Sequence, residues 1–149
     1  LYQTYLENGD LHSASFEIKE LLKKSLTDEI LLMYAELLFE QNKLKESYRT
    51  IQEIMAINAE NIDALLLMAK IQRVKREYFE EIETYKKILF IDENNVYALF
   101  ERGETYFLEN KPHRALEFYQ KALRSDPNYG LAELGIAKIK KKILIQNVS

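Results

Sequence analysis

The chain has 149 residues, a formal net charge of -3 and no cysteine. The missing cysteines exclude disulfides, thiolate metal ligands and cysteine nucleophiles. The small net charge argues against nucleic acid or an anionic membrane as the main partner. No run of about 18 apolar residues is present, so we expect no membrane-spanning helix.

An incomplete helical unit is predicted at residues 1–27. The pattern places the end of a truncated first helix near Tyr5, a turn at 8–10 and a second helix at 11–24. Because the chain starts at Leu1, inside a helical pattern and without Met, we expect it to be a piece of a longer protein. Its compartment is therefore left open between the cytoplasm and a bacterial periplasm.

Three full units of two helices each are predicted at 28–61, 62–95 and 96–129. Their spacing is 34 residues, a period typical of helical repeat arrays. The repeated positions are three leucines, three small residues and three large apolar residues: Leu31, Leu65 and Leu99; Ala35, Ala69 and Gly103; Ile51, Tyr85 and Tyr119. Such arrays present an extended surface and do not enclose a reaction.

The last full unit has the clearest helix signals. Gly103 lies in the middle of a predicted helix, where glycine costs ~1 kcal/mol relative to alanine. We therefore expect a neighbouring helix to approach closely at this position. Pro112 suits the start of the second helix because its missing N–H is harmless there, and Asn95 is placed to cap the first helix.

A final helix is predicted at 130–146, with a buried apolar stripe and a lysine-rich remainder. Terminal units of a repeat array need a polar outer face, so we interpret this helix as a cap. The lysines at 140–142 fit a hydrated cap more simply than an anion site. The predicted fold is all-α, a right-handed α-solenoid of antiparallel helix pairs.

The repeat resembles the tetratricopeptide repeat family. The residues of the last full unit that match the family pattern are Leu99, Gly103, Tyr106, Ala115, Tyr119, Ala122 and Pro127. Arg102 stands where the family usually has leucine, and the match weakens in the other units, where Ser47 and Glu81 replace the first alanine. The resemblance implies a protein-interaction scaffold whose first helices line a concave groove for a peptide or helix.

The resemblance also suggests which residues face that groove. They are Leu32, Met33, Glu36, Phe39, Leu66, Lys70, Arg73, Tyr97, Phe100, Glu104, Phe107 and Leu134. Members of the family that clamp a partner's terminal carboxylate carry lysine at places held here by Leu32, Leu66 and Phe100. We therefore reject the carboxylate clamp and expect an apolar strip edged by charges of both signs.

Some of these residues have a structural alternative. Leu66 and its neighbour Leu67 could instead pack between helices, since a solenoid buries more than one stripe per helix. Phe100 and Phe107 lie off the main buried stripe and are the stronger candidates for a binding role. An exposed apolar patch of this kind usually marks a binding site.

Two groups of residues could suggest a metal site or a catalytic site, but we interpret them as surface residues. His12 and His113 fall in different units, and a metal site needs three or four converging ligands. Glu80, Glu81 and Glu83 follow one another on a helix, which spreads neighbours around its axis. A hydrated charged face therefore fits these carboxylates better than an acid–base pair.

The sequence thus predicts a non-catalytic adaptor that binds a protein or peptide partner, without cofactor, metal, nucleic acid or membrane insertion. Two alternatives stay open. The first is self-association, including a homodimer, through the first unit at Leu1 and the edge formed by Leu131 and Leu134. The second is a targeting module within a larger protein.

Overall fold

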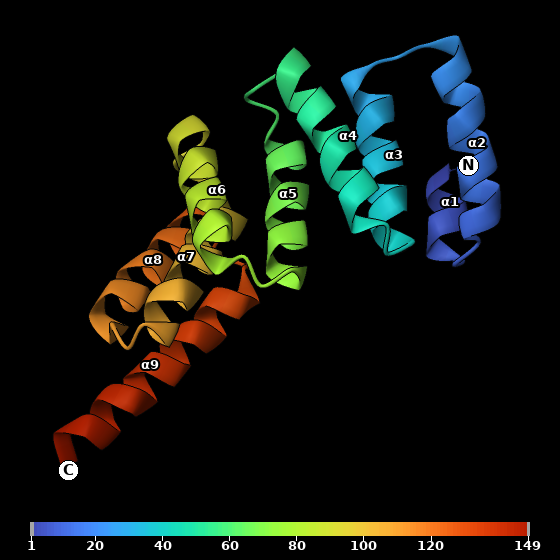
Figure 1. Cartoon of the computed structure of the whole chain (residues 1–149). Helices are drawn as coiled ribbons and strands as arrows, with labels where there is room; N and C mark the ends of the chain where they lie inside the picture. The colour runs from blue at the N-terminus through green and yellow to red at the C-terminus, as the bar shows by residue number, and fades with distance from the viewer. Residues whose placement is uncertain (1, 149) are drawn as a thin grey trace. The chain divides into compact units, whose positions relative to one another are not determined.

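The computed structural model describes residues 2–148, and all regular structure in that range is helical (Figure 1). Its helices are α1 (Tyr2–Glu7), α2 (Leu11–Lys24), α3 (Asp28–Glu40), α4 (Leu44–Ile57), α5 (Ile62–Val74), α6 (Tyr78–Ile91), α7 (Val96–Leu108), α8 (Pro112–Ser125) and α9 (Gly130–Val148). Short turns join helices that run in opposite directions, as α3 and α4 do in Figure 1. The predicted all-α fold of antiparallel helix pairs is confirmed.

The chain divides into two compact units, at 1–78 and 79–149. In the first unit α1 packs on α2, α2 on α3, α3 on α4 and α5, and α4 on α5. In the second unit α7 packs on α8 and α9, and α8 packs on α9. The predicted division into one domain with repeats at 28–61, 62–95 and 96–129 and a cap at 130–146 stays a prediction.

The core of the first unit includes two apolar clusters of described residues. One lies among α3, α4 and α5 and contains Leu31, Ala35, Ile51, Ile54, Ala64, Leu67 and Ile71. The other lies among α1, α2 and α3 and contains Tyr2, Ala14, Ile18 and Leu37. Removing such side chains from water supplies about 25 cal/mol for each Å² of apolar surface, the main force that holds the helices together.

The core of the second unit is built around the ring of Tyr119 on α8, which is 1% exposed. Two glycines flank this ring. A methyl group added at Gly103 would lie 2.5 Å from Tyr119 Cε1, and one added at Gly135 would lie 2.8 Å from Cε2. The expected close approach at Gly103 is confirmed, and the approaching group is an aromatic ring from the neighbouring helix.

The positions that repeat in the sequence are the positions that are buried. Leu31, Leu65 and Leu99 are 4%, 1% and 4% exposed. A further buried position recurs at Ser47 and Glu81, and the Ser47 hydroxyl donates a hydrogen bond of 2.7 Å to the Ala35 carbonyl. The prediction that Glu81 belongs to a hydrated face is therefore wrong, because this repeat position faces inward.

The turn inside each helix pair contains one residue in the left-handed region. These residues are Gly9, Asn42, Arg76 and Asn110, with φ of 71°, 59°, 62° and 59°. After the turn at Asn42, the Lys43 N–H donates to the Leu38 carbonyl at 2.8 Å. This bond and the left-handed residue form a Schellman-type helix end, which satisfies carbonyls that the helix leaves unpaired.

The first helices of the full units are capped by side chains. Asn61 Oδ1 accepts from the Ala64 N–H at 3.0 Å, and Asn95 Oδ1 accepts from the Ala98 N–H at 3.1 Å. The predicted cap at Asn95 is confirmed. Each bond satisfies one of the N–H groups that a helix start leaves without an intrahelical partner.

Candidate binding groove

One face of the first unit is hollowed, and we call this hollow the first-unit groove. It has a volume of about 860 Å³. Its lining comes from α1, the turn to α2, α3 and α5: Leu6, Glu7, Gly9, Leu11, Leu32, Glu36, Phe39, Glu40, Asp63, Leu66, Leu67 and Lys70. The lining residues of α3 and α5 recur at spacings of three and four, which places them on one face of each helix.

The groove combines apolar side chains with a strongly acidic set of charges. Four carboxylates and one ammonium group line it, since Lys70 is its single basic residue and no histidine is present in the lining. The apolar residues that line it are half-buried, apart from Leu67, which is 6% exposed and belongs to the core. The hollow therefore offers apolar contact area beside a negative potential.

The pKa of Glu36 reflects the low hydration and the negative charge of the groove. Loss of hydration raises the pKa of its carboxyl group above the ordinary glutamate range. The charges of Asp63 and Glu40 act in the same direction, whereas Lys70 opposes them. The side chain still has an exposed surface, so we attribute the shift to partial dehydration in the groove and not to full burial.

The groove contains five of the predicted first-unit binding residues: Leu32, Glu36, Phe39, Leu66 and Lys70. Met33 packs against the core of α1 and α2, and its carbonyl accepts a hydrogen bond of 2.7 Å from the Tyr2 hydroxyl. Arg73 is exposed on the last turn of α5 and lies outside the lining. For Leu67 the structural alternative holds, while Leu66 faces the groove.

Phe100 and Tyr97, predicted to bind a partner, take part in packing contacts in the second unit. The ring of Phe100 lies 5.7 Å from Tyr119 and 5.6 Å from Tyr129, measured between centroids. Tyr97 meets Tyr85 edge-on at 6.1 Å. Aromatic pairs of this geometry contribute about 0.5–1.5 kcal/mol beyond their buried area. Their role in partner binding stays a prediction.

Glu104 has a structural partner in the same unit. The Tyr119 hydroxyl donates a short hydrogen bond to the Glu104 carboxylate. Burial raises the pKa of the Tyr119 phenol, and the bond to Glu104 raises it further. Glu104 therefore helps to satisfy a largely buried hydroxyl, which is a structural task in addition to the binding role predicted for it.

Phe107 and α9 form a smaller hollow of about 480 Å³ in the second unit. Its lining is Phe107, Lys138, Lys141, Lys142, Ile145 and Gln146. Lys142 Nζ lies 4.8 Å from the centre of the Phe107 ring, close enough for a cation–π interaction. Leu134, also predicted for binding, is 60% exposed on α9 and lies outside this hollow.

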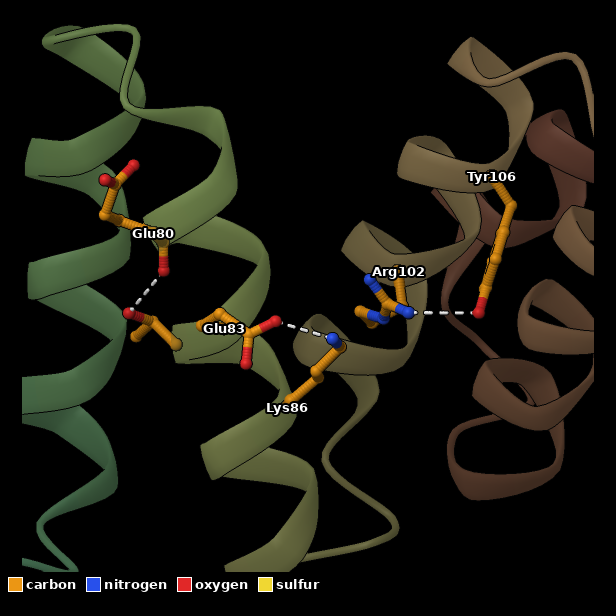
Figure 2. A network of polar contacts seen from close by, with 6 residues as sticks. Glu80, Glu83, Lys86, Arg102 and Tyr106 are labelled. Atoms are coloured by element: carbon orange, nitrogen blue, oxygen red, sulfur yellow. Dashed lines mark hydrogen bonds and ion pairs between the residues drawn. The ribbon is translucent and has the colours of Figure 1, made fainter.

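Glu80 and Glu83 of α6 do not face one another as an acid–base pair would. Figure 2 shows the carboxylates of Glu80 and Glu83 pointing in different directions, and Glu83 pairs with Lys86 at 2.6 Å. In α7, Arg102 donates a hydrogen bond of 3.1 Å to the Tyr106 hydroxyl (Figure 2). Its guanidinium carbon also lies 4.9 Å from the Tyr106 ring centre, which explains how a buried arginine replaces leucine there.

Comparison with known proteins agrees with this architecture. Residues 96–129 match the family model for the tetratricopeptide repeat. This helix pair is a tetratricopeptide repeat. The matched segment covers α7 and α8, the helix pair that holds Gly103 and Tyr119. A search of curated proteins finds no sequence match.

Solved structures of tetratricopeptide proteins share the fold. A tetratricopeptide repeat protein from Parabacteroides merdae ATCC 43184 is 23% identical with a TM-score of 0.78, over 94% of this chain and 56% of that one. The present chain thus spans little more than half of that structure. The first TPR of Spaghetti (RPAP3), bound to the HSP90 peptide SRMEEVD, is 18% identical with a TM-score of 0.68, over 78% of this chain and 93% of that one.

A third solved structure with this fold is the type III secretion chaperone SycD from Yersinia enterocolitica, in complex with a peptide of the translocator YopD. It is 15% identical with a TM-score of 0.68, over 76% of this chain and 92% of that one. Both of these peptide complexes show the fold in a peptide-bound form.

Among residues 2–148, no helix combines the length and apolar character that crossing a bilayer requires. The same residues contain no group of three or more His, Cys, Asp or Glu side chains placed to bind a metal ion. His12 and His113 are both exposed, in α2 and α8.

Sequence reasoning missed part of the groove lining. The missed residues are Leu6, Glu7, Gly9, Leu11 and Glu40. A signal was present, since Leu6 and Glu7 lie 33 positions before Phe39 and Glu40 in the incomplete first repeat. Extending the repeat register from the predicted Phe39 across the shortened link would have found Leu6.

Proposed function

We propose that this tetratricopeptide chain is a non-catalytic protein-interaction module whose first-unit groove receives a peptide or helix from a partner protein. The observation that carries the proposal is the combination of exposed apolar area and acidic charge in one hollow. Concave sites with apolar walls and a few charged groups are the usual places for ligand binding. The peptide complexes of Spaghetti and SycD support a peptide or protein as the class of partner.

The groove chemistry specifies the kind of segment that fits. Leu32, Phe39 and Leu66 offer contacts to a large apolar side chain, whose burial is worth ~1.5–3 kcal/mol. The surrounding carboxylates favour lysine or arginine next to that anchor. Ordering a flexible peptide offsets part of the gain, so we expect a dissociation constant on the order of micromolar for a short peptide.

The same chemistry disfavours an acidic peptide such as the HSP90 segment bound by Spaghetti. Leu32 and Leu66 leave no cation to pair with a terminal carboxylate at the positions where a clamp needs one. Lys70 is the single ammonium group in the groove. A charge-reversed peptide is therefore a matched negative control.

The test is fluorescence anisotropy with two synthetic helical peptides of equal length and equal leucine content, one carrying lysines and the other glutamates. We expect the basic peptide to bind and the acidic peptide to bind at least about tenfold more weakly. Leu66→Lys removes an apolar contact and adds a positive charge to the groove, so it should abolish binding of the basic peptide. Phe90→Lys is the matched control, because Phe90 is 92% exposed outside the groove.

Circular dichroism first establishes that both variants fold like the parent chain. Equal binding of the parent, Leu66→Lys and Phe90→Lys chains would place the binding site elsewhere. Equal binding of basic and acidic peptides would overturn the assignment of an acidic groove. Absence of binding at about 100 times the expected dissociation constant would overturn the groove as a peptide site.

A further inference from the structure

Helix α9 is apolar on two sides. Ala132, Gly135 and Ile139 are buried within the second unit. On the rest of the helix, Leu131, Leu134, Leu144 and Val148 are 52%, 60%, 66% and 88% exposed. A helix that is apolar all round is normally buried, and a group of exposed apolar residues marks an interaction surface.

The exposed side of α9 is also basic. It carries Lys138, Lys140 and Lys141, while the one acidic residue of the helix is Glu133. Leu134, Lys141 and Val148 are spaced by seven residues, so they follow one another along the same side of the helix. We call the residues Leu134, Lys138, Lys141, Leu144 and Val148 the outer face of α9.

This outer face and the first-unit groove have matching chemistry with opposite charge. The groove offers Leu32, Phe39 and Leu66 beside carboxylates, and the outer face offers leucines and valine beside lysines. Complementary charges steer association and fix its register, while buried apolar area supplies the affinity.

We propose that the outer face of α9 docks into the first-unit groove of a second copy of this chain. The proposal rests on the proposed function, since it names the partner of the same groove. Each copy carries one groove and one outer face. The contact therefore joins two different surfaces of two copies, and association rises with protein concentration.

Sedimentation velocity of the 149-residue chain tests this proposal directly. We expect the mean sedimentation coefficient to rise with protein concentration and to fall as salt is added, because the paired charges are screened. A groove variant, Glu36→Lys with Glu40→Lys, and a face variant, Lys138→Glu with Lys141→Glu, should each weaken association at least about tenfold.

Mixing the two variants separates docking from general charge effects. The groove variant keeps an intact outer face, and the face variant keeps an intact groove. An equimolar mixture should therefore associate at concentrations at which neither variant associates alone. A control pair at exposed positions outside both surfaces, Glu53→Lys and Lys87→Glu, should associate like the parent chain.

A chain that stays monomeric at all concentrations overturns the proposal, as does a mixture that forms no heterodimer. Leu134→Glu with Val148→Glu provides a second face variant at highly exposed positions that should fold normally. Binding of the basic peptide by a strictly monomeric chain would leave the groove function standing and remove only the self-docking. Failure of both experiments would remove both proposals.

Discussion

At the scale of single residues, the ring of Tyr119 organises the second unit. It is buried between Gly103 on α7 and Gly135 on α9, with no room for a methyl group on either side. Its hydroxyl is held by Glu104. The ring therefore connects three helices, and its neighbours must be glycine because the helix backbones pass so close to it.

Gly103→Ala is expected to destabilise the chain, although alanine is normally the better helix residue. The propensity gain is ~1 kcal/mol, whereas overpacking a rigid site costs about 1–3 kcal/mol. We expect a net loss of about 1 kcal/mol in the free energy of unfolding, measured by urea denaturation. Gly130→Ala is the control, since an added methyl group there meets nothing within 4 Å. A stabilising Gly103→Ala would show that the ring can move aside.

Glu36 gives a pH-dependent prediction. Its pKa is raised in the folded chain, so the folded state holds the proton more tightly than the unfolded state. The stabilising contribution is present at low pH and is lost as pH rises through the folded pKa. The groups in the groove around Glu36 are Glu7, Glu40, Asp63 and Lys70.

Glu36→Gln should therefore slightly increase the free energy of unfolding near pH 7, and the gain should vanish as pH falls below the raised pKa. The effect is small because the side chain is exposed. Denaturant unfolding across a pH series measures it. Glu53→Gln, on an exposed part of α4, controls for the loss of one negative charge. A gain that persists unchanged into acid would contradict the assignment.

At the scale of elements, the helix pairs share one turn geometry. A left-handed residue occurs at Asn42, Arg76 and Asn110, spaced by 34 residues, and at Gly9 in the incomplete pair. Glycine and asparagine tolerate this conformation, whereas a residue with a longer side chain is strained by roughly 1–2 kcal/mol. Arg76 therefore carries the largest backbone strain of these four residues.

Arg76→Gly is expected to stabilise the chain by up to about 1 kcal/mol, because it relieves the strain of a left-handed arginine. Thermal and urea unfolding would measure the change. Asn110→Gly is the matched control and should change little, since asparagine already accepts this geometry. A loss of stability in Arg76→Gly would mean that the arginine side chain contributes contacts that outweigh its backbone strain.

At the scale of the whole molecule, the chain consists of two compact units with separate cores. In repeat proteins stability is a sum of local terms and nearest-neighbour terms. Gly103→Ala should therefore reduce hydrogen-exchange protection mainly in α7, α8 and α9. Amides of α2, α3 and α4 should keep most of their protection, and equal losses throughout the chain would contradict this local picture.

Much of the fold could be predicted from the sequence because the repeat period specifies which residues are buried. Leu31, Leu65 and Leu99 share one inward position, and Asn95 caps the helix that it precedes. Glu81 was misassigned because its charge suggested water, whereas its repeat position faces the core. Gly135 was missed because its role depends on the ring of Tyr119, which comes from another helix.

The sequence by itself determined the all-α repeat architecture, since a period of 34 residues with apolar positions at helical spacing can bury its faces only by stacking helix pairs. Tertiary structure alone decided how the groove is formed, because α1, α3 and α5 are separated along the chain and only packing brings their side chains together. The repeat pattern indicates which residues each helix buries within its own pair. The shape and charge of a shared surface depend on which residues of several helices come to face one another.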